Sequence, residues 1–313
     1  MELGRRPAAT RRPVDDLESP GPGRIWWQLR QHLLLAPCLV LIAVLVVYPM
    51  GLSLYQGFHK DTPLDPENPF VGVQNYRGVA TDPNFINAVQ NTSKYLLFVT
   101  IGSLVMGMAM ALWLHSLRRG RGIALVLIVL PWAVPGTVVG ILWSFIFNPT
   151  DTGLLNAFLM RVHLISTPVV WLAHPLSGIL LISVTLVWET VPIAALILFA
   201  ALEAIPSELG ESAAMDGAGK VSQYVHITLP LLRPALAISM LNAGVLAIGI
   251  YDEVYVLAGF APETLPLVGK IYTYSFRDFN FGYGIAASVF VTAMTLVLSL
   301  FYLKVVYREV TFI

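Results

Sequence analysis

The chain has 313 residues, of which 56% are hydrophobic and only 12% are charged, and its formal net charge is zero. Soluble domains carry about 25% charged residues, so much of the surface of this protein is not expected to contact water. Zero net charge gives no general attraction for nucleic acid. The chain has one cysteine, Cys38, which excludes an intrachain disulfide and offers no zinc-binding cluster.

The N-terminal segment, residues 1–24, is rich in Arg, Pro and Gly and lacks an apolar core. It therefore does not resemble a cleavable signal peptide, and we expect a disordered cytoplasmic tail. The remainder, residues 25–313, is expected to form one transmembrane domain without a second soluble domain.

Six long apolar segments follow the tail. The hydrocarbon core of a bilayer is about 30 Å thick and needs about 20 apolar residues in a helix. Prolines inside such helices, here Pro131 and Pro135, are tolerated because neighbouring helices satisfy the freed carbonyls. The sequence therefore predicts an all-α polytopic membrane protein with about six transmembrane helices. The predicted spans are 33–55, 95–114, 123–147, 178–202, 235–258 and 284–303.

The Lys and Arg residues are distributed unevenly between the two sides of the membrane. With the N-terminus inside, thirteen of the 19 fall in inside segments and six fall in outside loops. Because inside loops carry an excess of positive charge, both termini are expected in the cytoplasm. The loop 203–233, between the fourth and fifth spans, lies on the same side.

This loop, residues 203–233, is the most informative connection. Pro206 suits the first turn of a short helix, and two glutamates follow where carboxylates favour the helix dipole. Gly217 and Gly219 break that helix and permit a tight turn, after which a second short helix runs to Pro230. Such a pair of helices can dock into a groove on a soluble partner, or lie on the membrane surface as an ordinary amphipathic loop.

The same loop carries residues at fixed spacing. Glu211 and two small residues are followed, after three intervening residues, by Gly217. Nine residues separate Gly217 from Ile227, and one residue separates Ile227 from Leu229 and Pro230. The pattern resembles the signature loop of the permease subunits of binding-protein-dependent ABC importers, with Ser212 replacing an alanine. The residues assigned to ATPase coupling are Glu208, Glu211, Ser212, Ala213, Asp216, Gly217, Ala218, Tyr224, Ile227, Leu229 and Pro230.

The resemblance extends over roughly residues 33–310 and points to the carbohydrate-uptake branch, which includes maltose, trehalose and glycerol-phosphate permeases. The Gly-Gly-Pro-type loop of that branch is replaced by Gly-Phe-Ala-Pro at 259–262, which leaves the solute open. The segments that carry the resemblance to the branch are 205–209, 216–218, 251–257, 271–276 and 281–288.

The resemblance implies the MetI-like, type I permease fold in the bacterial cytoplasmic (inner) membrane, and a chain that is not itself an enzyme. The implied partners are a second permease subunit of different sequence, two copies of a nucleotide-binding ATPase subunit, an extracytoplasmic solute-binding protein and the lipid bilayer. Residues 217–220 lack the upstream glycine and following hydroxyl of a phosphate-binding loop. ATP and Mg²⁺ are therefore expected on the separate ATPase, and no cofactor on this chain.

Polar and aromatic residues in the spans are candidates for the solute path. A carboxylate at the bilayer centre costs about 2.5–3.5 kcal/mol, so Glu189 should face the bundle interior, either accepting hydrogen bonds from sugar hydroxyls or pairing with another helix. Asp252 and Glu253, near the outer end of the fifth span, stand beside Tyr251 and Tyr255. These carboxylates and rings suit carbohydrate, or they form a solvated helix end. The other candidates can line the path or pack between helices. The full set is Glu189, Trp188, Asn242, Tyr251, Asp252, Tyr255 and Trp132.

The expected function is to form half of the translocation path for a di- or oligosaccharide, powered by the separate ATPase. The predicted membrane spans contain no Lys or Arg, which a phosphate ligand would want, and this favours a neutral sugar over glycerol-3-phosphate or a related polyol. A secondary transporter that uses Glu189 as its coupling acid is the less favoured alternative. A membrane enzyme would need convergent catalytic groups, and the sequence offers neither these nor a metal site.

Overall fold

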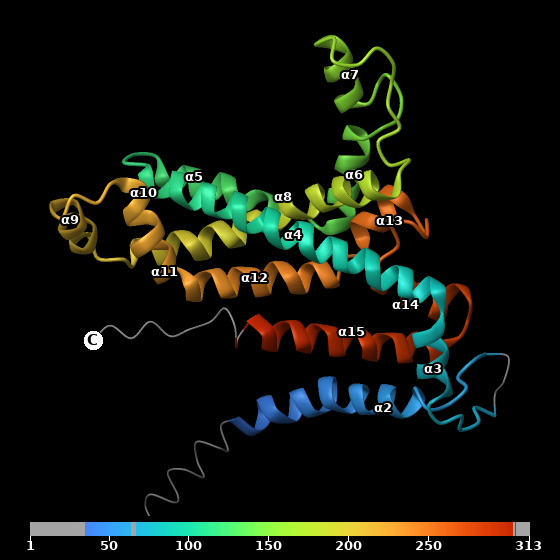
Figure 1. The fold of residues 1–313 in the computed structure, drawn as a ribbon. Helices are drawn as coiled ribbons and strands as arrows, with labels where there is room; N and C mark the ends of the chain where they lie inside the picture. Colours follow the sequence, from blue (N-terminus) through green and yellow to red (C-terminus); the bar gives the residue numbers. More distant parts are fainter. Residues whose placement is uncertain (1–34, 64–66, 303, 305–313) are drawn as a thin grey trace, which may run out of the picture. The chain divides into compact units, whose positions relative to one another are not determined.

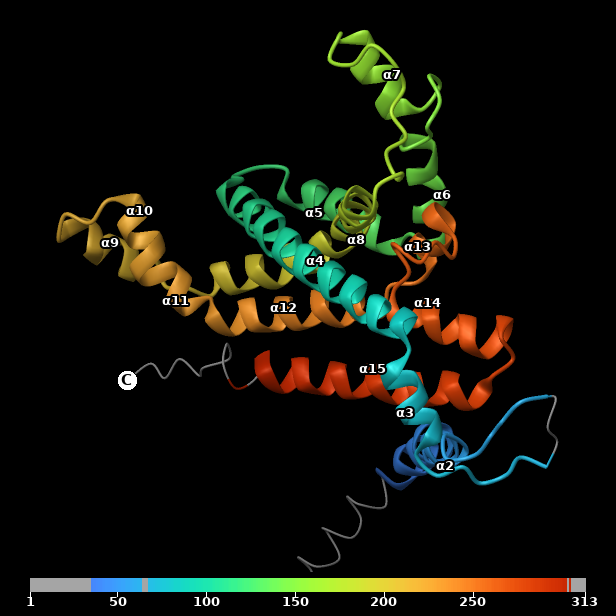
Figure 2. The same cartoon turned by 45° about the vertical axis from the view of Figure 1, so that its right-hand side comes forward.

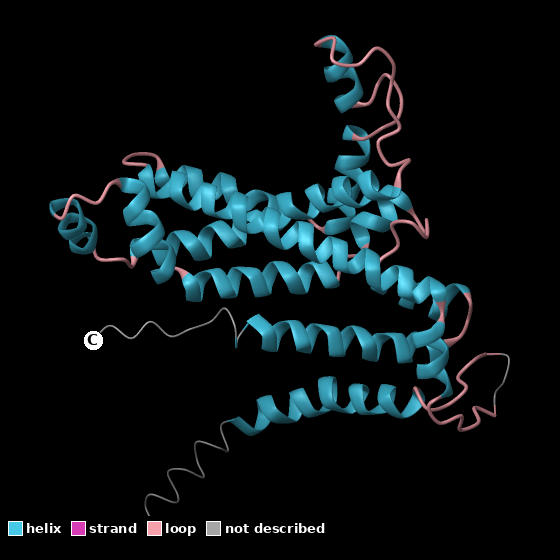
Figure 3. Ribbon diagram, in the orientation of Figure 1, coloured by secondary structure: helices cyan, strands magenta, loops and turns pink. Residues whose placement is uncertain are grey.

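The structure is a computed structural model that describes residues 35–63, 67–302 and 304, so the predicted tail, residues 1–24, lies outside the described residues. Regular structure in the described ranges is helical (Figure 3), apart from an isolated bridge between His59 and Phe70. The chain divides into two compact units, residues 1–53 and 54–313.

The described part of the first unit is helical. A continuous helix runs from Leu35 to Gln56, with its last three residues in the second unit, and it includes the π-helical segment η1 (Ala43–Val47) and α2 (Tyr48–Gln56). Its 22 residues rise about 33 Å at 1.5 Å per residue, which is enough to cross a hydrocarbon core of about 30 Å.

The second unit holds the remaining helices, with short 3₁₀ and π segments between some of them. In chain order these are α3 (Gln74–Thr81), α4 (Pro83–Ser116), α5 (Arg121–Val129), η2 (Leu130–Ala133), α6 (Gly136–Ile146), α7 (Leu154–Arg161), α8 (Pro175–Glu203), α9 (Ser207–Met215), α10 (Lys220–Gln223), η3 (Tyr224–Thr228), α11 (Leu229–Leu231), α12 (Arg233–Ile248), α13 (Asp252–Ala258), α14 (Leu267–Tyr272), η4 (Thr273–Arg277) and α15 (Phe281–Phe301).

Four helices of the described chain are long and apolar enough to cross a membrane, and up to six spans result if each of two bent helix pairs counts as one. The predicted all-α membrane protein with about six spans is therefore confirmed. Helix α4 has 34 residues and begins at Pro83, twelve residues before the predicted start of the second span. At about 51 Å it is longer than the hydrocarbon core, which is about 30 Å thick.

The three helices α4, α8 and α12 pack against one another and form the centre of the second unit (Figures 1 and 2). One buried cluster joins Tyr95 and Val99 of α4 to Ile182 of α8, Ala247 of α12 and Val254 of α13. A second cluster, toward the end of the bundle that bears α9 and α10, joins further apolar residues of the same three helices. The long helices are thus tied together at both ends.

Small residues let α4 and α8 approach closely. A Cβ atom placed on Gly107 would lie 2.8 Å from the Cβ of Ala194 and 3.3 Å from backbone atoms of α8. Close to this contact, the hydroxyls of Ser103 and Thr190 are 2.6 Å apart and fully buried. Small residues and hydroxyl pairs are the means by which helices associate in lipid, where the hydrophobic effect gives no driving force.

The contact at Gly107 makes a stability prediction. Gly107→Ala should lower the stability of the purified transporter by about 1–3 kcal/mol, because the added methyl must push α4 and α8 apart. Gly122→Ala is the matched control, since nothing lies within 4 Å of a Cβ at that helical position. Thermal unfolding in detergent measures both. Equal melting temperatures for the two variants would contradict the close helix contact.

The predicted third span, residues 123–147, is sharply bent. The axis of Arg121–Ala133 and that of α6 differ by 96°. The break falls at Val134, whose backbone is extended (φ −87°, ψ 128°), directly before Pro135. The proline ring disfavours helical geometry in the preceding residue and removes a backbone donor, so the helix ends and restarts in a new direction.

The predicted fifth span, residues 235–258, is also interrupted in the structure. Helix α12 ends at Ile248, and the short helix α13 starts at Asp252 after the break at residues 249–251. Two carboxylates occupy the first turn of α13, where the unpaired N–H groups and the helix dipole favour negative charge. At its other end α12 meets the helix of residues 220–231 at 67°.

Candidate functional site

Three carboxylates meet between α8 and α13. Glu189 of α8 lies beside Glu253 and Asp252 at the start of α13, close enough for the like charges of the three side chains to interact. Glu253 is only 5% exposed, and one oxygen of Glu189 is buried with no hydrogen-bond partner among the described residues. Carboxylates without a partner are costly inside a membrane, so this arrangement indicates a polar site with a functional role.

A glycine of α6 leaves room for the buried carboxylate. A Cβ atom placed on Gly136 would lie 2.6 Å from Oε1 of Glu253. The first turn of α6 therefore covers the carboxylates, and the bend at Val134–Pro135 brings that turn to them. Any larger residue at this position would displace Glu253.

Aromatic rings continue from the carboxylates along the neighbouring loop. Tyr251 and Tyr255 stack with ring centroids 5.8 Å apart and an interplanar angle of 12°, and Tyr251 lies 5.5 Å from Tyr272. Phe260 contacts Tyr255 at 5.2 Å and stacks on Tyr272 at 5.6 Å. Tyr255 is 49% exposed and Tyr272 is 37% exposed. Open faces of tyrosine beside carboxylates can bind a ligand that is apolar on one face and hydroxylated at its rim.

A charged cluster lies outside the bundle, at the start of α4. The Lys270 ammonium is 3.8 Å from the Asp82 carboxylate and 4.2 Å from the ring centroid of Tyr274, whose hydroxyl donates a hydrogen bond to Asp82. Burial alone would raise the pKa of Asp82, but the hydrogen bonds from Tyr274 and from the N–H of Asn84, together with the Lys270 charge, leave that pKa below its ordinary value. The cluster ties α4 to α14 and η4.

The loop 203–233 projects beyond the ends of the long helices (Figure 1). Helix α9 closes with a turn in which the N–H of Ala218 donates to the carbonyl of Ala213 at 2.9 Å, while Gly217 takes φ +83°. The side chain of Gln223 donates to the Ala218 carbonyl at 2.8 Å. The turn is therefore built by hydrogen bonds and depends on a left-handed glycine.

The surface of this loop is open and partly apolar. Met215 is 90% exposed, Val221 is 79% exposed and Leu209 is 39% exposed. None of the residues assigned to coupling from the sequence is buried. Exposed apolar side chains on a projecting loop form a candidate contact surface for another protein or for the membrane.

Comparison with known proteins decides the family. Residues 103–308, more than half of the chain, match the family described as the inner-membrane component of binding-protein-dependent transport systems. The chain belongs to this family. Its membership makes it a multi-pass permease subunit of the inner membrane, which is non-catalytic and needs no cofactor of its own. It also implies a complex with a solute-binding protein and an ATPase, as predicted.

Relatives resemble the permease over almost its whole length. It is 32% identical to the trehalose/maltose transport system permease protein MalF of Thermococcus litoralis, over 88% of this chain and 92% of the relative. It is 30% identical to the sn-glycerol-3-phosphate transport system permease protein UgpA of Brucella abortus, over 89% and 95%. Its fold matches a chain from a bacterial ABC transporter that imports the acidic polysaccharide alginate, with a TM-score of 0.74, 22% identity and coverage of 89% and 96%.

The predicted path residues of the permease do not all come together. Glu189 and Asp252 belong to the group of carboxylates, and Tyr251 and Tyr255 flank Asp252 at the start of α13. Trp188 instead lines an apolar pocket, where its ring contacts that of Trp143 at 6.3 Å.

The other two predicted path residues lie on η2 and α12. Trp132 is 53% exposed. Asn242 is half-buried on α12 and makes no side-chain hydrogen bond to the described residues. Their role in the path stays a prediction.

The structure also brings in residues that the sequence did not indicate. Tyr272 and Phe260 complete the aromatic group, although nothing in their local pattern marks them. At the base of the projecting loop, Glu203 lies 2.7 Å from Nδ1 of His115 and accepts a hydrogen bond from Arg121 at 3.0 Å. This clamp joins the ends of α4, α5 and α8 next to α9. The positions of its charged residues at helix ends were the signal in the sequence that could have predicted it.

Proposed function

We propose that the permease forms half of the translocation path for a neutral di- or oligosaccharide. The observation that carries the proposal is the group of carboxylates at Glu189, Asp252 and Glu253 beside the open faces of Tyr255 and Tyr272. Carboxylates accept hydrogen bonds from sugar hydroxyls, and aromatic faces cover the apolar faces of sugar rings. The trehalose/maltose permease among the relatives supports the same class of solute.

The coupling loop supplies the second part of the proposal. Residues 203–233 dock on a separate ATPase through the exposed surface of α9 and the helix that follows Gly219. Thirteen of the 19 Lys and Arg residues favour the cytoplasm for this loop and for both termini. The complete importer then contains a second permease of different sequence, two ATPase copies that hold ATP and Mg²⁺, and an extracytoplasmic solute-binding protein.

An anionic solute is the main competitor. A relative named for sn-glycerol-3-phosphate transport is almost as similar to the chain as the trehalose/maltose permease. However, residues 95–114, 123–147, 178–202, 235–258 and 284–303 contain no Lys or Arg. A phosphate beside the three carboxylates would be repelled by their charge, and the guanidinium of Arg277, 4.5 Å from the ring centroid of Phe260, lies in η4, outside these spans.

A panel of solutes tests the proposal. The purified transporter, with its binding protein, is assayed for stimulation of ATPase activity by maltose, trehalose, larger glucosides and sn-glycerol-3-phosphate. We expect stimulation by a neutral saccharide and none by sn-glycerol-3-phosphate. Stimulation by the phosphate alone would overturn the assignment to neutral sugars while leaving the family and the coupling role intact.

A further inference from the structure

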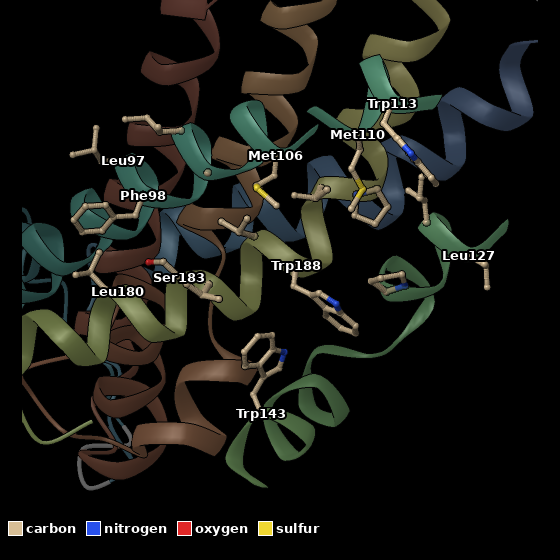
Figure 4. Close-up of a pocket in the computed structure, with 18 of the residues that line it drawn as sticks. Leu97, Phe98, Met106, Met110, Trp113, Leu127, Trp143, Leu180, Ser183 and Trp188 are labelled. Atoms are coloured by element: carbon tan, nitrogen blue, oxygen red, sulfur yellow. The ribbon is translucent and has the colours of Figure 1, made fainter. Parts of the chain in front are cut away.

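A large apolar pocket lies on the side of the bundle, apart from the carboxylates. It has a volume of about 1000 Å³ and is bounded by α4, α5, α6 and α8, inside the bend of the third span (Figure 4). Met106, Met110 and Trp113 line it from α4, and the rings of Trp143 and Trp188, which also line it, meet edge to face.

The walls of this pocket offer few hydrogen-bonding groups to a sugar. Its one hydroxyl-bearing lining residue, Ser183, already donates its hydrogen bond to the carbonyl of Ile179 at 2.7 Å. The remaining lining side chains are apolar apart from the tryptophan N–H groups. A ligand that fills this pocket must therefore be aliphatic along most of its length.

The pocket is open on its side. Met106 is 49% exposed and Leu127 is 61% exposed although both line it. In a membrane, an apolar surface that is open in this way faces either acyl chains or another helix. Helices that pack in lipid prefer small residues at their contact, whereas this pocket is lined mostly by Met, Leu, Val, Ile, Phe and Trp.

Positive charge stands at one end of the pocket. Trp113 and Ala124 line that end, and the turn between them carries Arg118 and Arg119. Both arginine side chains are exposed and make no hydrogen bond or ion pair with the described residues, whereas Arg121 is engaged by Glu203 at 3.0 Å. Two guanidinium groups without a partner among the described residues, on the turn that joins the pocket-lining helices α4 and α5, complement an amphiphile with an anionic head.

We propose that this pocket binds an anionic phospholipid. Arg118 and Arg119 hold the phosphate of the headgroup, Trp113 sits at the level of the interface, and the acyl chains run between α4 and α5 into the bend of the third span. The lipid fills the space that the bend at Val134–Pro135 opens and supports α6, whose first turn covers Glu253. The inference does not depend on which solute is carried.

Lipid retention by the intact transporter tests the headgroup part. The purified complex is exposed to phosphatidylglycerol or to phosphatidylcholine with the same acyl chains, and bound lipid is counted by native mass spectrometry. Preferential retention of phosphatidylglycerol is expected. The double variant Arg118→Gln, Arg119→Gln should weaken retention of phosphatidylglycerol roughly 30-fold, because each positive charge near the surface contributes about fivefold. The matched double variant Arg118→Lys, Arg119→Lys should retain it.

A second pair of variants tests the pocket itself. Met106→Trp fills the pocket and should reduce phosphatidylglycerol retention, whereas Val105→Trp, at the adjacent position of the same helix and outside the pocket lining, should not. Thermal unfolding confirms that each variant is folded. Equal retention of the two lipids by the unaltered complex would overturn the proposal. Separation of the two permeases by Met106→Trp with unchanged lipid retention would overturn it in favour of a partner helix.

Discussion

Replacing Glu253 with glutamine should reduce ATP-driven uptake of a neutral saccharide roughly 10- to 100-fold. A hydrogen bond to a charged acceptor contributes about 1.5–3 kcal/mol, and each 1.4 kcal/mol is a factor of ten. Glu253 is 5% exposed and lies beside Glu189, so the substitution replaces a buried charged acceptor with a neutral amide. Uptake into proteoliposomes that contain the whole transporter, together with solute-stimulated ATPase activity, measures the effect.

The control for this variant is Glu263→Gln, which removes an exposed carboxylate from the loop after α13. Its uptake should match the unaltered protein. Glu189→Gln, the partner of Glu253, should show a loss of the same order. If neither Glu189→Gln nor Glu253→Gln changes transport or ATPase stimulation, the two carboxylates have only a structural role between α8 and α13, and the proposed path is wrong.

Replacing Gly217 with tryptophan should release the ATPase from the permease. Gly217 takes φ +83°, a conformation that costs an L-residue about 1–2 kcal/mol, and nothing lies within 4 Å of a Cβ at this position. The ring would therefore both strain the turn after α9 and stand out from the docking surface. At least a tenfold drop in ATPase subunit recovered with tagged permease is expected.

Gly122→Trp is the matched control for the coupling variant. Position 122 is also free of neighbours within 4 Å of a Cβ, but it lies on α5 outside the projecting loop and does not need a positive φ. It should co-purify with the ATPase normally. Recovery of a fully coupled transporter containing Gly217→Trp would show that the loop does not dock there.

The sequence was sufficient for those features that depend on neighbours along the chain. Apolar length predicted the helical spans, and the spacing around Gly217 predicted both a glycine turn and the family. The two short helices of the loop start where Pro206 and Gly219 allow, although the second continues one residue past Pro230 to Leu231. Local chemistry determines each of these features.

Features that depend on direction or on distant contacts were not predictable in the same way. Hydropathy does not register that a helix turns by 96°, although the restriction before Pro135 is a local cause that could have been recognised. The pairing of Glu189 with Glu253 joins α8 to the start of α13, and no local pattern encodes it. Trp188, next to Glu189 on the same helix, faces a different environment because successive helical residues are rotated by about 100°.

The most direct test of the central claim is to measure which energy source drives uptake by the reconstituted transporter and which solute it takes up. Labelled neutral disaccharide is supplied with the binding protein on the outer side, and ATP is enclosed with the ATPase on the inner side. Uptake is expected to need both ATP and the binding protein and to continue when an uncoupler collapses the proton gradient. Uptake that stops with the uncoupler and proceeds without the ATPase would contradict the account and assign the carboxylates to ion coupling instead.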